Sequence, residues 1–137
     1  MEGSMEIKSS NDMAGKIFSE LKNYNDKFEP KVNFEHKTFY IEDDGEFVAG
    51  LEGFFAWDVF DISNMISLRK REGLGRKLIA QAEEYAKEKG ATKITAWTLD
   101  FQSPEFYKKC GFQRYAKLEN FAGKSTCHYF VKYLKGQ

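Results

Sequence analysis

Hydrophobic side chains recur every three to four residues in two parts of the chain, and this spacing predicts two amphipathic helices. The first helix starts at Ser10 or Asn11, either of which can cap it, and it ends near residues 23–25. The second helix is the longer one, and it runs from Leu74 to a stop at Gly90. Its apolar face consists of Leu74, Leu78, Ala82, Tyr85 and Ala86.

Aromatic and β-branched residues, which favour strands, fill much of the remaining chain. Residues 38–41 and 47–51 are predicted to form a hairpin, because Asp44-Gly45 between them favours a tight turn. The run 53–67 is predicted to contain two strands with a turn near Trp57-Asp58. The remaining expected elements are a buried strand at 92–99, a short helix at 104–110, and a final strand pair at 112–118 and 126–134.

The long helix connects two strands, and the order strand, helix, strand is that of a crossover unit. The two strands are therefore expected to be parallel neighbours. In such a unit a ligand binds at the carboxyl edge of the first strand, where the N-terminus of the helix points. A ligand site is accordingly predicted just before Leu74.

Length and charge limit the classes of function. The chain has 137 residues, which suits a single domain over 1–137, and residues 1–4 could be additions from cloning. Lys plus Arg and Asp plus Glu number 21 each, so no net positive charge attracts nucleic acid. No apolar run reaches the roughly 20 residues that span a bilayer. With two cysteines and no secretory leader, a cytoplasmic protein with reduced thiols is expected.

The segment Lys70-Arg71-Glu72-Gly73-Leu74-Gly75-Arg76-Lys77 leads into the long helix. The first turn of a helix has unpaired N–H groups and the positive end of the helix dipole, and glycine lets an anion reach those amides. Two glycines among cations at this place therefore favour a phosphate-bearing ligand. A simple turn with a solvated basic face is the alternative interpretation of the same residues.

A second motif lies in the short helix, Ser103-Pro104-Glu105-Phe106-Tyr107-Lys108-Lys109-Cys110-Gly111-Phe112. The two motifs together resemble those of the GNAT superfamily of N-acetyltransferases, over roughly residues 37–134. The family has an acetyl-CoA loop R/Q-x-x-G-x-G/A and then A-x-x-F/L-Y-x-x-x-G-F/Y. The resemblance implies an α/β (α+β) fold, with a mixed and mainly antiparallel sheet, helices on both faces, and a splay where the coenzyme enters.

The resemblance also implies a cosubstrate, acetyl-CoA, and no metal. In the family, amides of the glycine loop bind the pyrophosphate of the coenzyme, and the pantetheine arm pairs with the end of the preceding strand. The coenzyme-binding residues implied here are Met65, Ile66, Ser67, Lys70, Arg71, Glu72, Gly73, Leu74, Gly75, Arg76, Lys77, Asp100, Ser103 and Tyr107. Asp100 stands at the position of an asparagine in many members.

Acetyl transfer needs a neutral amine, a donor for the developing oxyanion and an acid for the departing thiolate. By resemblance Tyr107 is that acid, since a tyrosine with a reference pKa of ~10 is protonated at neutral pH. Asp61, Asp58 and Glu52 are candidates for the general base, and Asp61 is favoured.

Three further residues have side chains that can act in catalysis or bind a metal. His36 and His128 have no partner at catalytic or metal-ligand spacing, and both are interpreted as structural. Cys110 lies near the end of the short helix and lacks an environment that activates a thiol.

The predicted function is acetyl transfer from acetyl-CoA to a primary amine by direct attack, without a covalent enzyme intermediate. The acceptor is expected to be a small molecule or a peptide, bound by the first helix, its following loop and residues 54–60 and 121–126. Neither nucleic acid nor a membrane is expected as a partner, and a homodimer is left open. The alternatives are a non-catalytic acyl-CoA-binding or regulatory module of the same fold, and a nucleic-acid-binding domain that uses the cations of residues 69–77.

Overall fold

The computed structural model describes Gly3 and residues 5–28 and 33–134. It divides the chain into two compact units, Met1–Val32 and Asn33–Gln137, and each is described by itself. A single domain over residues 1–137 stays a prediction. Of the residues ahead of Met5, only Gly3 lies within the described part.

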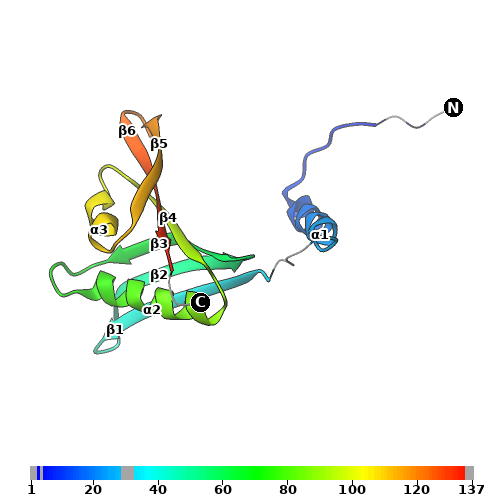
Figure 1. Cartoon of the computed structure of the whole chain (residues 1–137). Helices are drawn as coiled ribbons and strands as arrows, with labels where there is room; N and C mark the ends of the chain where they lie inside the picture. The colour runs from blue at the N-terminus through cyan, green and yellow to red at the C-terminus, as the bar shows by residue number, and fades with distance from the viewer. Residues whose placement is uncertain (1–2, 4, 29–32, 135–137) are drawn as a thin grey trace. The chain divides into compact units, whose positions relative to one another are not determined.

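The first unit contains a short 3-10 helix η1 (Asn11–Met13) and the helix α1 (Ala14–Asn25), which is labelled in Figure 1. Ser10 caps this pair, because its hydroxyl oxygen accepts a hydrogen bond from the Asp12 amide at 3.3 Å. No residue of α1 is buried. The first predicted helix is thereby confirmed.

The second unit is built on a six-stranded sheet with the order β1-β2-β3-β4-β6-β5. Strands β3 and β4 pair in parallel, and the other neighbours pair antiparallel. The parallel pair flanks helix α2 (Leu74–Glu88), as predicted for the crossover unit. The strands are β1 (Glu35–Asp43), β2 (Glu46–Ala56), β3 (Val59–Ser67), β4 (Lys93–Leu99), β5 (Gln113–Phe121) and β6 (Ser125–Tyr133).

Helix α2 and the short helix α3 (Pro104–Lys109) contribute to one hydrophobic core. The strand register places Phe60 and Phe130 on the same side of the sheet, through Ile94 and Ala96 of β4. The Tyr85 ring of α2 packs edge-on against Phe60 at 5.3 Å, and α3 adds its own aromatic ring to the same core. The apolar face predicted for the long helix is buried as expected.

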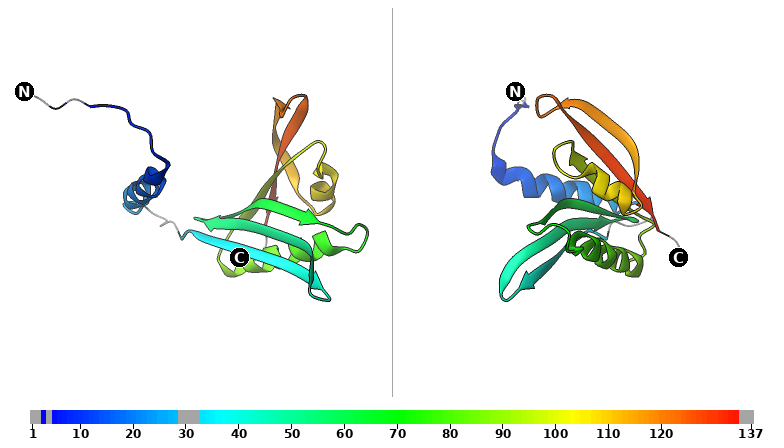
Figure 2. Two further views of the ribbon diagram at one scale, coloured as in Figure 1. Left: turned by 180° about the vertical axis from the view of Figure 1, so that it is seen from behind. Right: turned by 90° about the vertical axis from the view of Figure 1, so that its left-hand side faces the viewer.

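Strands β3 and β4 separate soon after they meet. Their pairing covers four residue pairs, from Val59 with Lys93 to Ile62 with Ala96, although β3 continues to Ser67 and β4 to Leu99. Figures 1 and 2 show the β5–β6 hairpin projecting away from the layer of β1–β3. The predicted mixed, mainly antiparallel sheet with packed helices and a splay is therefore confirmed.

Candidate functional site

The glycine loop lies where the sequence predicted it, at the start of α2. Gly73 is the residue before the helix and has a left-handed backbone, with φ +73°, which favours glycine. No side chain caps the helix, and the first bond of its ladder runs from the Lys77 amide to the Gly73 carbonyl at 3.1 Å. The amides of Leu74, Gly75 and Arg76 precede that bond and have no acceptor within the helix. These groups form an anion-binding helix start.

The cations of the loop differ in whether a carboxylate already pairs with them. Arg69 is held by Asp43 at 2.7 Å and by Glu72 at 3.7 Å, so its charge is already compensated. Within the part of the chain that the structure describes, no carboxylate pairs with Lys70, Arg71 or Lys77. Three cations of this loop could therefore bind a phosphate, whereas Arg69 holds the loop to the β1–β2 hairpin.

Gly75 allows α2 and α3 to approach closely. A Cβ atom at this position would lie 2.9 Å from Cζ of Phe106 and 3.3 Å from Cε of Met65. Both contacts are shorter than the usual separation of about 3.5–4.0 Å between carbon atoms. The second glycine of the motif therefore brings the phosphate loop and the second motif together.

Tyr107 bridges the two sides of the splay. Its hydroxyl donates a hydrogen bond to the sulfur of Met65 on β3 at 3.9 Å, and its ring stacks on Phe130 of β6 at 5.7 Å. Burial raises the pKa of Tyr107 to about 12, and the nearby Cys110 and Asp61 add to the shift. The hydroxyl is therefore protonated at neutral pH, and its present partner is a sulfur atom. A coenzyme thiol sulfur could accept from the same donor.

Asp61 lies beside the point where the strands separate. It pairs with Thr95 of β4 in the register, and the Thr95 hydroxyl donates to Asp61 Oδ1 at 2.6 Å. Burial raises the pKa of Asp61 above its ordinary value, although the bond from Thr95 acts in the opposite direction. A carboxylate that is costly to ionise is suited to accept a proton.

The other two candidates for the base have different surroundings. Asp58 lies in the turn between β2 and β3, where the Thr92 hydroxyl donates to it at 3.0 Å and Lys93 pairs with it at 3.4 Å. These contacts fasten the turn to β4. Glu52 lies one strand further from the splay than Asp61.

Asp100 and Ser103 lie between β4 and α3. Asp100 Oδ2 accepts from the Thr126 amide at 2.9 Å, and Oδ1 contacts Nε2 of His128 at 2.5 Å. These bonds, with His128 first, hold the pKa of Asp100 below its ordinary value. Ser103 precedes α3, and its amide donates to the Thr98 hydroxyl at 3.2 Å. Asp100 is thus tied to β6 by two hydrogen bonds.

Both histidines, interpreted from the sequence as structural, have a carboxylate partner in the folded protein. His128 contacts Asp100, and His36 Nε2 contacts Oε1 of Glu52 at 2.7 Å. Asn64 donates to the other oxygen of Glu52. Strand pairing creates these contacts between residues 12 to 28 positions apart, so no local pattern could have indicated them.

Cys110 and Cys127 are free and buried. Burial raises the pKa of the Cys110 thiol, with partial compensation from Arg76 and Lys132. A nucleophilic cysteine requires a lowered pKa, so this environment agrees with the interpretation of an unreactive thiol.

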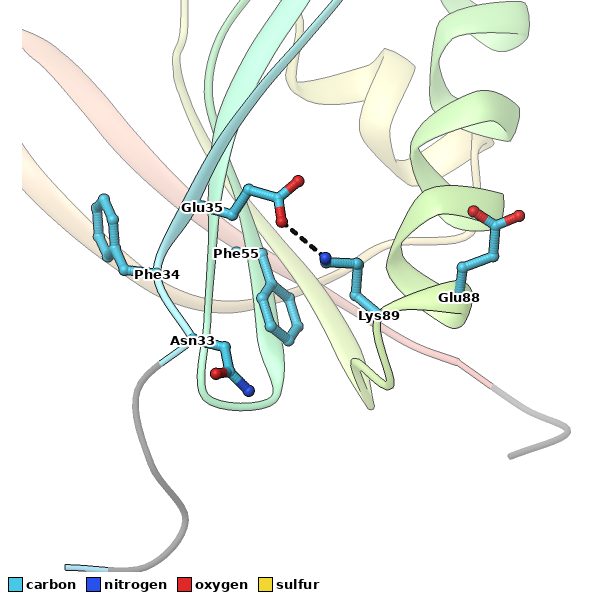
Figure 3. Close-up of a pocket in the computed structure, with 6 residues that line it drawn as sticks. All are labelled: Asn33, Phe34, Glu35, Phe55, Glu88 and Lys89. Carbon is cyan, nitrogen blue, oxygen red and sulfur yellow. Dashed lines mark ion pairs between the residues drawn. The ribbon is translucent and has the colours of Figure 1, made fainter. Parts of the chain in front are cut away.

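The structure also contains a cavity away from the glycine loop. It has a volume of about 410 Å³, and the ion pair of Glu35 with Lys89 at 2.7 Å crosses it (Figure 3). Because Lys89 follows the last residue of α2, this cavity lies at the opposite end of the helix from Gly73. It is not part of the predicted coenzyme site.

The described residues contain neither a candidate metal site nor a candidate membrane-spanning helix. Gly3, 5–28 and 33–134 include no group of three or more His, Cys, Asp or Glu residues that could hold a metal ion. In the same residues, no helix has both the length and the apolar character needed to cross a membrane.

Comparison with known proteins identifies the family of this chain. The model of the acetyltransferase (GNAT) family matches residues 10–112. The blasticidin-S acetyltransferase of Streptomyces morookaense is 32% identical over 102 residues, which are 72% of this chain and 75% of that protein.

Solved structures of acetyltransferases have the same fold. An acetyltransferase from Bacillus cereus ATCC 14579 superposes with a TM-score of 0.86 at 26% identity, covering 96% of this chain and 98% of that one. A Bacillus anthracis str. Ames protein, assigned as a streptothricin acetyltransferase and solved in complex with acetyl coenzyme A, has the same fold. Its TM-score is 0.67 at 19% identity, and the match covers 81% of this chain and 68% of that one. The chain therefore belongs to the GNAT family of acetyl-CoA-dependent N-acetyltransferases.

Proposed function

We propose that this enzyme transfers the acetyl group of acetyl-CoA to a primary amine of a small-molecule acceptor, by direct attack at the splay between β3 and β4. The observation that carries the proposal is the position of Tyr107, whose hydroxyl donates to Met65 on one side of the splay while its ring stacks on Phe130 on the other. A protonated donor beside a sulfur atom suits the departure of a thiolate. The acceptors named for relatives, blasticidin S among them, support a small amine.

The proposed reaction has one chemical step. Asp61 takes a proton from the acceptor ammonium, and the neutral nitrogen attacks the thioester carbonyl. The new C–N bond forms as the C–S bond breaks, and the electron pair leaves with the sulfur as a thiolate, which accepts a hydrogen bond from the Tyr107 hydroxyl. The nitrogen then loses its second proton to the thiolate, which departs as the thiol. With a pKa of about 12, Tyr107 is a weaker acid than a thiol, whose reference pKa is about 8.5, so stabilising the thiolate by a hydrogen bond is the role that suits it best.

The coenzyme is proposed to bind along β3 and at the start of α2. Its pyrophosphate would accept from the amides of Leu74, Gly75 and Arg76, with Lys70, Arg71 and Lys77 compensating the charge. Met65, Ile66 and Ser67 end β3 without a partner on β4, which supports a pantetheine arm paired there. By resemblance to the family, Glu72, Asp100 and Ser103 are proposed to contribute to the same site. The free, buried thiols also support the proposed cytoplasmic location.

Two measurements on the purified protein test this function. Isothermal titration with acetyl-CoA measures binding, and a thiol-release assay over a panel of amines measures turnover. Binding together with amine-dependent thiol release is the expected result. Binding without release on any amine would support the non-catalytic module instead. Binding of DNA that weakens steeply with salt would support the nucleic-acid alternative.

A further inference from the structure

Glu52 is a carboxylate fixed in place on the sheet face that carries Asp61. One of its oxygens contacts His36 Nε2 at 2.7 Å, and the other accepts from the amide of Asn64. A carboxylate only accepts hydrogen bonds, so the histidine nitrogen must be the donor. The two oxygens have about four acceptor positions between them, and two of these are used. Glu52 is thus oriented but can still accept hydrogen bonds from a ligand.

The charge of Glu52 has no strong compensation. Its hydrogen bonds to His36 and Asn64 hold its pKa below the ordinary value, so it is ionised at neutral pH. In the described part of the chain no lysine or arginine pairs with it, whereas Glu35 has Lys89. The side chain of Glu52 is 29% exposed. A cation that reaches this face would therefore find an accessible negative charge.

The position of Glu52 relates it to the reacting centre. Phe54 lies two residues further along β2, directly opposite Asp61 on β3 and His36 on β1. Pairing with β1 is regular from Glu52 to Phe54, so both side chains lie on the same face as Asp61. The register of β2 with β3 shifts between Glu52 and Gly53, and the Cα atoms of diagonal neighbours in a regular ladder are roughly 7–8 Å apart. The half-buried Phe54 ring is next to Asp61, and it packs against His36 at 4.8 Å.

We propose that Glu52 is a specificity-determining residue, which binds a second cationic group of the acceptor while Asp61 deprotonates the amine that is acetylated. The apolar spacer between the two groups would lie over Phe54. Preferred acceptors are then diamines or amines with a guanidinium group, with about four carbon atoms between the nitrogens, because such a chain spans a separation of this size. This inference rests on the proposed function.

Steady-state thiol release tests it with three probes at saturating acetyl-CoA: 1,4-diaminobutane, agmatine and n-butylamine. For the wild-type enzyme, kcat/KM should be at least tenfold higher for the two dications than for the monoamine. Glu52→Gln keeps the size of the side chain and one of its two acceptor oxygens but removes its charge. It should lower kcat/KM for the dications by about tenfold or more, mainly through KM, and leave n-butylamine unchanged.

Glu46→Gln is the matched control, since Glu46 is an exposed glutamate of the same strand, at its far end. It should change none of the three values. Equal kcat/KM for monoamine and dications in the wild type would overturn the inference and leave the proposed function intact. Equal losses on all three probes in Glu52→Gln would also overturn it, because they indicate a structural role. Absence of thiol release with every amine would instead overturn the proposed function.

Discussion

Replacement of Gly75 by alanine tests the close contact between the phosphate loop and α3. The added Cβ would lie 2.9 Å from Cζ and 3.0 Å from Cε1 of Phe106, and 3.3 Å from Cε of Met65. Overpacking of this kind costs about 1–3 kcal/mol. Alanine recovers up to about 1 kcal/mol over glycine in a helix, so the net loss of folding free energy should be about 1 kcal/mol.

Urea unfolding monitored by circular dichroism measures this change, which should appear as a lower midpoint with an unchanged slope. Gly15→Ala is a matched control, because Gly15 is also the second residue of its helix, and nothing lies within 4 Å of its Cβ position. It should leave the midpoint unchanged or raise it. Phe106→Leu in the same chain as Gly75→Ala removes the clashing ring. The double variant should therefore lose less free energy of unfolding than the two single variants lose in total.

The substitution should also affect catalysis, because Phe106 adjoins Tyr107 and their rings are 5.5 Å apart. We expect a lower kcat for thiol release, since displacement of Phe106 moves the tyrosine hydroxyl. If Gly75→Ala were as stable as Gly15→Ala, or if the double variant showed no coupling, the argument from close packing would be refuted.

Three further substitutions probe the proposed site. Tyr107→Phe should lower kcat by about 10²-fold or more while acetyl-CoA binding, measured by titration, stays nearly unchanged. Asp61→Asn should abolish most thiol release. It should also be more stable than the wild type at neutral pH. Burial raises the folded-state pKa of Asp61, so the free energy of unfolding of the wild type falls as the pH rises through that pKa and the carboxyl ionises. At pH values below the ordinary value of 3.8, the two proteins should be equally stable in urea. Gly73→Ala should lose about 1–2 kcal/mol from its φ of +73° and bind acetyl-CoA more weakly, although no atom lies near the new methyl group.

Each of these has a result that would contradict it. Unchanged turnover in Tyr107→Phe would remove the tyrosine from the mechanism. A stability difference between Asp61→Asn and the wild type that does not depend on pH would show that the carboxyl is not destabilised by its burial. Full coenzyme affinity in Gly73→Ala would mean that the left-handed loop is not needed for phosphate binding.

Much of the fold was predictable because it depends on local patterns. The apolar stripe of α2, the Asp44-Gly45 turn and the parallel relation of β3 and β4 each follow from residues close together in the chain, or from a topological rule. The glycine loop and the second motif were recognisable for the same reason. The glycines before and after Leu74 also predicted a helix start that could bind a phosphate, since the unpaired amides belong to the helix itself.

Only the tertiary structure decided which distant side chains meet. Asp61 and Asp58 differ in their surroundings. Asp61 is half-buried beside Thr95, whereas Asp58 lies in an exposed turn with Lys93. The contacts of His36 with Glu52 and of His128 with Asp100 depend on strand register, where a shift of one residue would move each side chain to the other face. Spacing in the sequence carries no information about such pairings. The sequence by itself therefore determined the family and the glycine loop, whereas the folded sheet decided the surroundings of Asp61 and Glu52.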